Sequence, residues 1–517
     1  MGDVPCAKIR PMSTAQRAGN LSRLVASAAE SAADRPALIH GSRRTTWAEL
    51  EAEVAAFAGA LVARGLQPGD RVALVLGNVP EFVVGYFGSL RAGCVAVPVS
   101  TALTAPELAG VLQDSGARAV AASRTAAELV ASVRGTLTAL EHVIVADQSK
   151  SSGDTTGFDG LVFEGRERPL TEPVGGDEDL AVLLFTSGTS GRPRGAMLTH
   201  RALLANLEQC AAISPAPIEA GDVVLAALPF AHVYGLNATL GMVARMAATA
   251  VLVERFDPVD TLAEVRRHKV TAVPGAPPMW LAWSLLPDVG EALSGLRMAV
   301  SGAAPLPAEV LTRLKELTGQ PIYEGYGLTE TAPVLTTTLC SPEVKPRSVG
   351  RAIPGIELQL LDTRPDDIGE ITVRGDNLFS GYWPDGSDGP DADGWFRTGD
   401  LGYWDDDGDL FIAGRSKELI LVSGFNVYPR EVEDALLAHP DVAEAAVVPI
   451  PHPYTGESVK AFLVLHDGAE LGADDAVAWC ARRLARFKCP TAVEIVDELP
   501  HTSTGKVAKG ALAEPAS

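Results

Sequence analysis

Residues 186–195, with the sequence TSGTSGRPRG, combine the residue types that proteins use to bind phosphate groups. Glycines allow successive backbone N–H groups to converge on one anion, because they adopt conformations that other residues rarely reach. Hydroxyl groups and positive charges come from six residues of the stretch: Thr186, Ser187, Thr189, Ser190, Arg192 and Arg194. No Gly-Lys-Ser/Thr closes the loop, so it is not a Walker A motif. A flexible Ser/Gly linker is the alternative on composition alone, but an apolar run at 181–185 and a predicted helix at 201–210 flank the loop and favour anion binding.

Four further motifs follow this loop along the chain. They are SGAAPL at 301–306, YEGYGLTET at 323–331, a long stretch from WFRTGD to YPREVE at 395–433, and TSTGKVAKGAL at 502–512. In order and approximate spacing, the five motifs resemble those of the adenylate-forming enzymes, which include acyl-CoA synthetases, coumarate–CoA ligases, firefly luciferases and adenylation domains. With the N-terminal elements, the resemblance covers nearly the whole chain.

This resemblance implies a two-step reaction that needs ATP, Mg²⁺ and coenzyme A. A carboxylate is joined to the α-phosphate of ATP with release of pyrophosphate, and the acyl group then passes from the adenylate to a thiol. Because two anions meet in the first step, cations and hydrogen-bond donors must be positioned beforehand. The loop at 186–195 would hold the β- and γ-phosphates.

The same resemblance assigns roles in nucleotide binding. Tyr326 would stack on adenine, Thr329 would contact the α-phosphate, and Glu330 would carry Mg²⁺, which proteins often hold through one carboxylate. Asp400 would accept hydrogen bonds from the ribose hydroxyls, with Arg415 as its neighbour. The implied set that binds ATP or AMP is Thr186, Ser187, Gly188, Thr189, Ser190, Gly191, Arg194, Ala303, Ala304, Glu324, Gly325, Tyr326, Gly327, Thr329, Asp400 and Arg415.

The implied catalytic lysine lies in a different domain from the phosphate-binding loop. Lys506 would bridge the substrate carboxylate and the α-phosphate, so the two domains must close for the reaction. We expect an N-terminal adenylation domain over residues 1–415 and a small mobile domain over 416–517. In relatives the small domain then rotates about a hinge residue, and Lys417 occupies that position here.

Coenzyme A would reach the adenylate after that rotation. Ser423 and Gly424 of the VSGFN motif would line a tunnel for its pantetheine arm, because glycine leaves room for the arm to pass. Arg255 stands where some family members place a cation for the phosphates of coenzyme A.

The segment LPFAHVYGL, residues 228–236, resembles one wall of the family's acyl pocket. Members that activate amino acids have an Asp at the position of His232, so a histidine indicates a substrate without an α-amino group. A core histidine that bonds a backbone carbonyl is the alternative. Tyr234 and Gly302 are expected to line the same pocket, whose apolar residues suit a fatty or an aromatic tail.

These assignments predict an acyl-CoA synthetase that acts on a fatty or related carboxylic acid. An acyl-AMP ligase that loads a carrier protein, a luciferase-like enzyme and a nucleotide-binding regulator without turnover are the alternatives. In the phosphate loop, Arg194 replaces the more usual lysine, which keeps the charge but changes the geometry.

The elements that must position these residues follow an α/β pattern. Residues 45–65 predict an amphipathic helix that begins with a capping box of Thr46 and Glu49 and ends at Gly65. Short apolar strands alternate with such helices, which predicts a parallel sheet covered on both faces. Residues 148–179 are polar and glycine-rich, so we expect a surface connection there.

The pattern changes after residue 355 to short strands with tight turns, which predicts a small β-barrel-like subdomain. Its DDDGD run at 405–409 predicts a hairpin turn, since the glutamate that closes a calcium loop is absent. The last hundred or so residues alternate between strand and helix, which predicts a small α+β domain. Residues 223–244 are apolar but interrupted by Pro229, Gly235 and Asn237, so we expect buried strand and loop rather than a membrane span.

Composition limits the choice of partners and compartment. Lys and Arg number 43 against 65 Asp and Glu, and the net charge of −22 disfavours nucleic acids and anionic membranes. Six cysteines show no paired spacing, so neither a zinc site nor a disulfide framework is expected. The N-terminal sequence lacks the apolar core of a signal peptide, and we expect a cytoplasmic protein. The sequence does not define the oligomeric state, and a homodimer stays one of the options.

Overall fold

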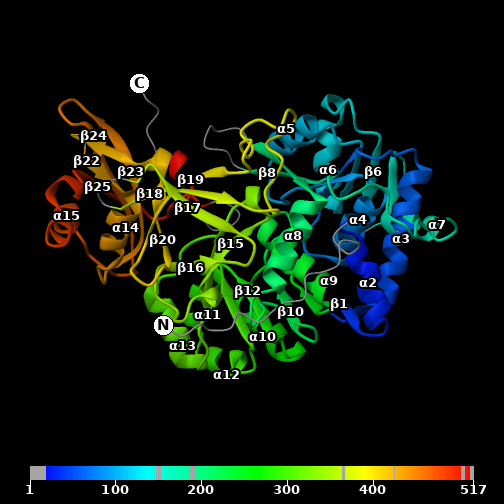
Figure 1. Ribbon diagram of the computed structural model, residues 1–517, viewed down its shortest axis with the longest axis horizontal. Helices are drawn as coiled ribbons and strands as arrows, with labels where there is room; N and C mark the ends of the chain where they lie inside the picture. Colours follow the sequence, from blue (N-terminus) through cyan, green and yellow to red (C-terminus); the bar gives the residue numbers. More distant parts are fainter. Residues whose placement is uncertain are drawn as a thin grey trace.

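The computed structural model describes residues 19–146, 148, 153–186, 193–363, 367–423, 425–501 and 507–512. Within these residues the strands form three sheets. Two sheets and their helices make up the blue-to-yellow part of Figure 1, and the third lies in the orange part on its left. The predicted α/β architecture is confirmed.

The first sheet is parallel except for its last strand. Its strands are apolar and buried, as is typical of parallel strands covered on both faces. In spatial order they are β7 (Thr155–Gly157), β6 (His142–Val145), β5 (Ala119–Ala122), β3 (Arg71–Val75), β4 (Val95–Pro98), β8 (Leu180–Thr186) and β9 (Arg194–Thr199). The helices on its two faces are α3 (Trp47–Ala63) and α4 (Pro80–Arg91) on one and α5 (Ala105–Ser115) and α6 (Arg124–Val133) on the other. The predicted parallel sheet with two covered faces is therefore confirmed.

The second sheet changes from parallel to antiparallel pairing near its middle. In spatial order its strands are β17 (Glu357–Leu361), β18 (Gly369–Arg374), β19 (Phe396–Trp404), β20 (Leu410–Arg415), β16 (Ser348–Ala352), β15 (Val334–Thr337), β14 (Tyr323–Gly327), β13 (Met298–Ser301), β12 (Ala272–Gly275), β10 (Val223–Ala226), β11 (Thr249–Leu252), β1 (Pro36–His40) and β2 (Arg43–Thr46). β14 pairs in parallel with β13 and antiparallel with β15. The antiparallel strands of the small subdomain thus continue the large sheet, and residues 405–409 form the predicted hairpin turn between β19 and β20.

The third sheet has its own core and belongs to the C-terminal part of the chain. Its strands are β22 (Phe425–Val427), β21 (Ile420–Val422), β24 (Gly456–Leu465), β23 (Val442–His452) and β25 (Ala492–Ile495). Helices α14 (Pro429–Leu437) and α15 (Ala473–Ala481) pack on it through buried residues such as Val432, Leu436 and Cys480. A short 3₁₀ turn, Ser416–Glu418, separates β20 of the second sheet from β21 of the third.

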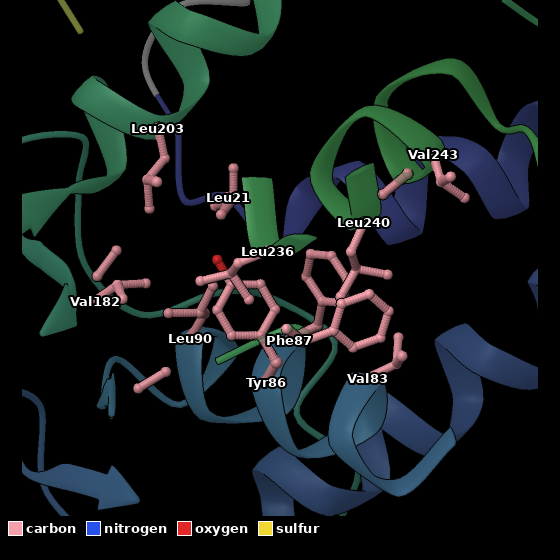
Figure 2. Packing of buried hydrophobic residues seen from close by; sticks show 14 of the residues in the cluster. Leu21, Val83, Tyr86, Phe87, Leu90, Val182, Leu203, Leu236, Leu240 and Val243 are labelled. Carbon is pink, nitrogen blue, oxygen red and sulfur yellow. The ribbon is translucent and has the colours of Figure 1, made fainter. Parts of the chain in front are cut away.

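The two large sheets are joined by helices that share one core. Figure 2 shows α4 residues such as Tyr86 and Phe87 packed against Leu236, Leu240 and Val243 from the opposite side. Burying a side chain of this size contributes about 1.5–3 kcal/mol, so this interface fixes the two sheets relative to each other. Further helices are α2 (Arg23–Ala32), α8 (His200–Ala211), α10 (Pro258–His268), α11 (Pro277–Ser284), α12 (Val289–Leu293) and α13 (Ala308–Thr318).

The start of α3 forms as the sequence predicts. The Thr46 hydroxyl accepts the Glu49 backbone N–H at 3.2 Å, and the Glu49 carboxylate accepts the Thr46 backbone N–H at 2.8 Å. This capping box satisfies two N–H groups that a helix start leaves unpaired. Gly65, which has a φ of +83°, follows the helix end, where a left-handed conformation stops helices.

The prediction of a surface connection over residues 148–179 was wrong in part. Residues 158–165 form helix α7 (Phe158–Gly165) next to β7. Its Phe158 ring stacks on Phe57 of α3 with centroids 5.1 Å apart, and Leu161 is fully buried. Eight residues are too few to show a sustained helical period, so this packing was not visible in the sequence.

The prediction of buried strand and loop within residues 223–244 was wrong in part: residues 227–232 are irregular as expected, but the segment after them is helical. β10 is the expected buried strand, but a π-helix (Tyr234–Gly241) and helix α9 (Met242–Met246) replace the rest of the loop. Asn237 does not break this segment, because it is fully buried and donates to the carbonyl oxygens of Leu203 and Ala332 at 3.1 and 2.7 Å. Helical turns are stabilised here by tertiary hydrogen bonds that the local sequence does not reveal.

In the part of the chain that the structure describes, we find no helix with the length and apolar character needed to cross a membrane.

Candidate active site

A single large cavity brings together most of the residues that the sequence motifs indicated. Its volume is about 1870 Å³, and its walls come from the first sheet, the second sheet and the C-terminal part of the chain. Ligand pockets usually measure about 300–1000 Å³, so this cavity has room for more than one small molecule. The predicted residues that line it are Thr186, Arg194, His232, Tyr234, Gly302, Ala303, Gly325, Tyr326, Gly327, Thr329, Glu330, Arg415 and Lys417.

A buried network centred on Asp400 forms one end of the cavity. Asp400 and Arg415 face each other across the antiparallel strands β19 and β20, and Arg415 Nε lies 2.8 Å from Asp400 Oδ1. The Tyr326 hydroxyl, from β14, donates to Asp400 Oδ2 at 2.6 Å. Burial and the adjacent carboxylate raise the pKa of Tyr326 well above its usual value, so the phenol stays a donor. We call these three residues the nucleoside end.

The strands on either side of the glycine-rich loop are paired. Thr186 at the end of β8 faces Arg194 at the start of β9, so the loop between them closes a hairpin. Residues Ser187, Gly188, Thr189, Ser190 and Gly191 lie outside the described part of the chain. β9 follows the loop before the predicted helix, α8, begins at His200.

Arg194 contacts three groups of one neighbouring loop. Its guanidinium lies 3.8 Å from the centroid of the Tyr382 ring and 2.8 Å from Asp388 Oδ2, and it donates to the Ser387 hydroxyl at 3.3 Å. A planar guanidinium stacks on an aromatic face in a way that an ammonium group does not reproduce. Arginine at this position therefore makes a stacking contact with Tyr382 that lysine would not reproduce.

Glu330 lies beside this group of residues on the cavity wall. Its Oε1 accepts the Tyr382 hydroxyl, and its backbone carbonyl accepts the Phe379 N–H at 3.0 Å. Of its two carboxylate oxygens, Oε2 would be the one that contacts a cation. Magnesium usually takes one or two carboxylates and completes its shell with phosphate oxygens and water, so Glu330 fits such an ion. Among the described residues no cluster of three or more His, Cys, Asp or Glu side chains could hold a metal by itself. We call Glu330, Arg194, Tyr382 and Asp388 the phosphate end.

Part of the cavity wall is apolar and includes the neighbours of His232; we call this part the apolar branch. The His232 Nδ1 accepts the Tyr234 N–H at 3.3 Å, which orients the ring at the start of the π-helix. A Cβ atom at Gly302 would lie 2.9 Å from the Tyr234 ring, so this glycine allows the ring to pack on the backbone. The apolar residues that line this part are Cys210, Ile213, Pro217, Ile218, Val233, Ala238, Met242, Val334 and Leu339.

The C-terminal part of the chain closes the cavity from the other side. Glu418, His501 and residues 507–511 belong to its lining. Lys509 joins two elements there, with its Nζ 2.8 Å from Glu433 and 3.2 Å from Glu418. Lys506 lies in the segment 502–506, outside the described residues.

Some predicted residues do not line the cavity. Neither Asp400 nor Ala304 is part of the lining. Asp400 contacts Tyr326 and Arg415, which do line the cavity. The buried carboxylate of Glu324 accepts the Leu306 N–H at 3.0 Å.

The two described residues predicted for coenzyme A are also absent from the lining. Arg255 is exposed after β11, and Ser423 is exposed in the turn between β21 and β22. Gly424, between those strands, is outside the described residues.

Sequence reasoning missed Tyr382, Asp388 and Lys509. Tyr382 contacts Glu330, which is 52 positions away, and Arg194, which is 188 positions away. Such contacts leave no spacing signal in a single sequence. The one local sign is the tight glycine-rich turn SGYWPDGSDG at 380–389, which is typical of a loop with a defined shape.

Comparisons with known proteins agree with this geometry. A family model described as AMP-binding enzyme matches residues 25–383, and a model described as AMP-binding enzyme C-terminal domain matches residues 431–506. A long-chain-fatty-acid–CoA ligase of Bacillus subtilis (strain 168) is 34% identical over 514 residues, which covers 93% of this chain and 92% of that protein. A feruloyl-CoA synthase of an Amycolatopsis species is 36% identical over 484 residues, which covers 92% and 94%.

Solved structures of one protein, MatB of Rhodopseudomonas palustris, are similar along the whole chain. The ATP-bound crystal structure has a TM-score of 0.86 and the apo structure a TM-score of 0.76, each at 32% identity and with 95% of this chain and 98% of that chain covered. The chain therefore belongs to the AMP-binding enzyme family. It is an ATP-dependent acyl-CoA synthetase, an AMP-forming ligase that uses Mg²⁺ and coenzyme A.

Proposed function

We propose that this acyl-CoA synthetase activates fatty acids, and that the 1870 Å³ cavity is its active site. The observation that carries the proposal is the apolar branch beside His232. Its walls are formed by aliphatic side chains and a methionine, including Ile213, Ile218 and Met242. Flexible, unbranched methionine adapts to ligands of irregular shape, and aliphatic walls suit an alkyl chain.

An aromatic acid is the second candidate, because the feruloyl-CoA synthase of Amycolatopsis matches as well as the fatty-acid ligases do. Aromatic substrates commonly pack on aromatic side chains in offset or edge-to-face geometry. The residues of the apolar branch defined above are aliphatic or sulfur-containing, and the neighbouring Tyr234 ring packs on Gly302. This composition supports a fatty acid, while the aromatic residues Phe185, Tyr326, Tyr382 and Phe396 line the cavity as well.

The adenylation step uses the two ends of the site. A carboxylate oxygen of the acid attacks the α-phosphorus of ATP, the bond from that phosphorus to the bridging oxygen breaks, and pyrophosphate leaves. Tyr326 and Asp400 bind the nucleoside, and Thr329 contacts the α-phosphate. The charge of Arg194 attracts the β- and γ-phosphates. Glu330 would hold Mg²⁺, which neutralises phosphate charge when it is bound.

Lys506 supplies the remaining cation, between the substrate carboxylate and the α-phosphate. The cavity lining supports this role, because residues 507–511 and Glu330 border the same space. The higher TM-score with the ATP-bound than with the apo structure of MatB also supports an arrangement of the two parts suited to ATP.

Transfer to coenzyme A would follow a rotation about Lys417, which lies in the turn between the second and third sheets. That turn divides an adenylation domain over 1–415 from a mobile domain over 416–517. After the rotation, Ser423 and Gly424 would line the thiol tunnel and Arg255 would meet the phosphates of coenzyme A. The exposed positions of Ser423 and Arg255 outside the cavity support a role that begins only then.

The proposal is tested by pyrophosphate release with a panel of acids, followed by product analysis. Fatty acids of increasing length, ferulate and benzoate are each incubated with ATP and Mg²⁺, and with either coenzyme A or a phosphopantetheinylated carrier protein. We expect the highest kcat/KM with a fatty acid and thioester formation with coenzyme A. Preference for ferulate would assign the aromatic class, and product only with the carrier would assign carrier loading.

A Lys506→Ala variant separates turnover from nucleotide binding alone. We expect pyrophosphate release to fall by about a hundredfold, as when one preorganised charge donor is removed. Equal release by both proteins would indicate a nucleotide-binding regulator.

We propose the cytoplasm as the compartment, since the cysteines of the described residues are free thiols, as in reducing environments. Light scattering on the purified protein would decide between a monomer and a homodimer.

A further inference from the structure

Residues 377–383 form a segment that ties the metal-binding end of the site to the phosphate-binding hairpin. On one side, the Phe379 N–H donates to the carbonyl oxygen of Glu330 at 3.0 Å. On the other side, the Trp383 N–H donates to the carbonyl oxygen of Gly195 in β9 at 2.8 Å. The segment therefore holds the backbone of both elements at once.

A glycine fixes the shape of this segment directly before Tyr382. Gly381 has a φ of +93°, a conformation that favours glycine. A Cβ atom there would lie 2.1 Å from the carbonyl oxygen of Gly386, so no other residue fits without a backbone shift. Tyr382 is thereby placed at a defined point between the two elements.

The Tyr382 side chain touches both of the charged groups that face the cavity. Its hydroxyl donates to Glu330 Oε1, and its ring carries the Arg194 guanidinium 3.8 Å from its centroid. The Phe379 ring packs edge-on against it, with centroids 5.1 Å apart, and restricts its rotation. Tyr382, Glu330 and Arg194 all line the cavity.

We propose that Tyr382 is a positioning residue for Mg²⁺·ATP: its hydroxyl fixes the Glu330 carboxylate, and its ring keeps the Arg194 guanidinium apart from that carboxylate. The inference rests on the proposed roles of Glu330 and Arg194 in the adenylation step.

Two physical arguments support this role. A carboxylate with one oxygen held by a donor presents its other oxygen in a fixed direction, which lowers the entropy cost of binding a cation. A guanidinium next to a free carboxylate would pair with it and occupy both groups. The ring lies against the guanidinium, whose ion pair is with Asp388 instead, so Glu330 stays available to the metal.

The first test is a titration of Tyr382→Phe, which keeps the ring and removes the hydroxyl. A non-hydrolysable ATP analogue is titrated into the protein by calorimetry, once with EDTA and once at a series of Mg²⁺ concentrations. We expect an unchanged Kd in EDTA and an about tenfold weaker Kd at saturating Mg²⁺, since hydrogen bonds to charged groups are among the strong ones. Tyr403→Phe, an exposed tyrosine of β19 outside the cavity lining, is the matched control and should behave as wild type.

A double-mutant cycle shows whether the hydroxyl acts through Glu330. In the background of Glu330→Gln, whose side chain lacks the charge, Tyr382→Phe should cause no further loss of Mg²⁺-dependent affinity. Glu330→Asp, which retracts the carboxylate from the hydroxyl, should reproduce the Mg²⁺-specific loss without a change at Tyr382. Thermal melting verifies that each variant is folded, and Glu330→Asp carries the test should Tyr382→Phe not fold.

Activity assays complete the test. In Tyr382→Phe we expect the Mg²⁺ concentration for half-maximal pyrophosphate release to rise severalfold, with an unchanged KM for the acid. An unchanged Mg²⁺ dependence, or an equal loss of affinity with and without Mg²⁺, would overturn the inference. Failure of the proposed function is distinct from this, because it would appear in the wild-type protein, as preference for an aromatic acid, as product only with the carrier or as no pyrophosphate release with any acid.

Discussion

The two ends of the nucleotide site are built in different ways. At the nucleoside end, the Asp400 side chain is 5% exposed, and Tyr326 and Arg415 bond both of its oxygens at 2.6 and 2.8 Å. At the phosphate end, Arg194 is paired with Asp388, whose side chain is 70% exposed. The two arginines are similarly exposed, Arg415 to 39% and Arg194 to 36%, so the ends differ in the burial of their carboxylates. An exposed ion pair contributes about 0–1 kcal/mol, and loss of the partner of a buried carboxylate costs more.

This difference matches the role that we propose for each end in the reaction. Adenosine stays bound through both steps, so its contacts gain from being preorganised. Pyrophosphate must leave after the first step, so its contacts gain from partners that are exchanged at little cost. If Arg194 binds phosphate as proposed, Asp388 would be such a partner when no phosphate is present.

Asp400→Asn should have the largest effect on activity, because it removes the charge at the centre of the nucleoside end. Arg415 would then face a neutral amide instead of a carboxylate, and the ribose hydroxyls would lose an anionic hydrogen-bond acceptor. We expect kcat/KM for ATP to fall by about a hundredfold, measured by pyrophosphate release. The matched change at the other end, Asp388→Asn, should stay within about twofold of wild type. Equal losses in the two variants would show that the ends do not differ.

Glu324 extends the comparison to a buried carboxylate without a full set of partners. It lies on β14 with Tyr326, and its Oε1 accepts the Leu306 N–H while its Oε2 has no hydrogen-bond partner in the described residues. Burial raises the pKa of Glu324 to about 7, although the Leu306 N–H and the charge of Arg430 oppose the shift. Between its usual value of 4.5 and about 7, the folded protein keeps a proton that the unfolded chain has lost, so stability falls as pH rises through this window.

Glu324→Gln removes this titration. The variant should match wild type near pH 4.5 and be more stable by about 3 kcal/mol at pH 8, in line with a pKa difference of this size. Urea unfolding at both pH values measures this. A variant that is less stable than wild type at pH 8 would mean that the Glu324 charge is compensated in the fold.

Much of the fold could be predicted because it depends on local signals. The capping box at Thr46, the glycine after α3 and the apolar strands of the first sheet all lie within a few residues of one another. Helix α7 and the π-helix could not be predicted, since Phe158 and Asn237 are stabilised by partners that are distant in sequence.

The candidate site shows the same limit. Tyr326, Glu330 and Arg415 are found by motif, and the structure places them around one cavity. Tyr382 belongs to none of the motifs used, although it contacts Glu330 and Arg194 together. A residue that acts through two others distant in sequence can be recognised only from the folded structure.

Tyr326→Phe tests the nucleoside end with a smaller chemical change. The ring that would stack on adenine remains, and only the hydrogen bond to Asp400 is lost. We expect an about tenfold weaker Kd for AMP and for ATP, and the loss should be the same with and without Mg²⁺. Tyr323→Phe, on the same strand but outside the cavity lining, is the control. A loss confined to Mg²⁺ conditions would contradict the division into two ends.

Arg194→Lys should give the smallest effect, because the phosphate end depends more on the charge of residue 194 than on the shape of its side chain. A lysine keeps the charge that attracts phosphate but cannot lie flat on the Tyr382 ring. We expect kcat/KM for ATP to fall only about threefold, with a steeper dependence on salt, since a cation without the ring contact is held mainly by long-range attraction. Arg201→Lys, which changes an arginine of α8 that pairs with Glu178 outside the cavity, controls for the substitution itself. A loss as large as that of Asp400→Asn would mean that the stacked guanidinium is as fixed a part of the site as the nucleoside end, and that Asp388 is a permanent partner rather than one exchanged for phosphate.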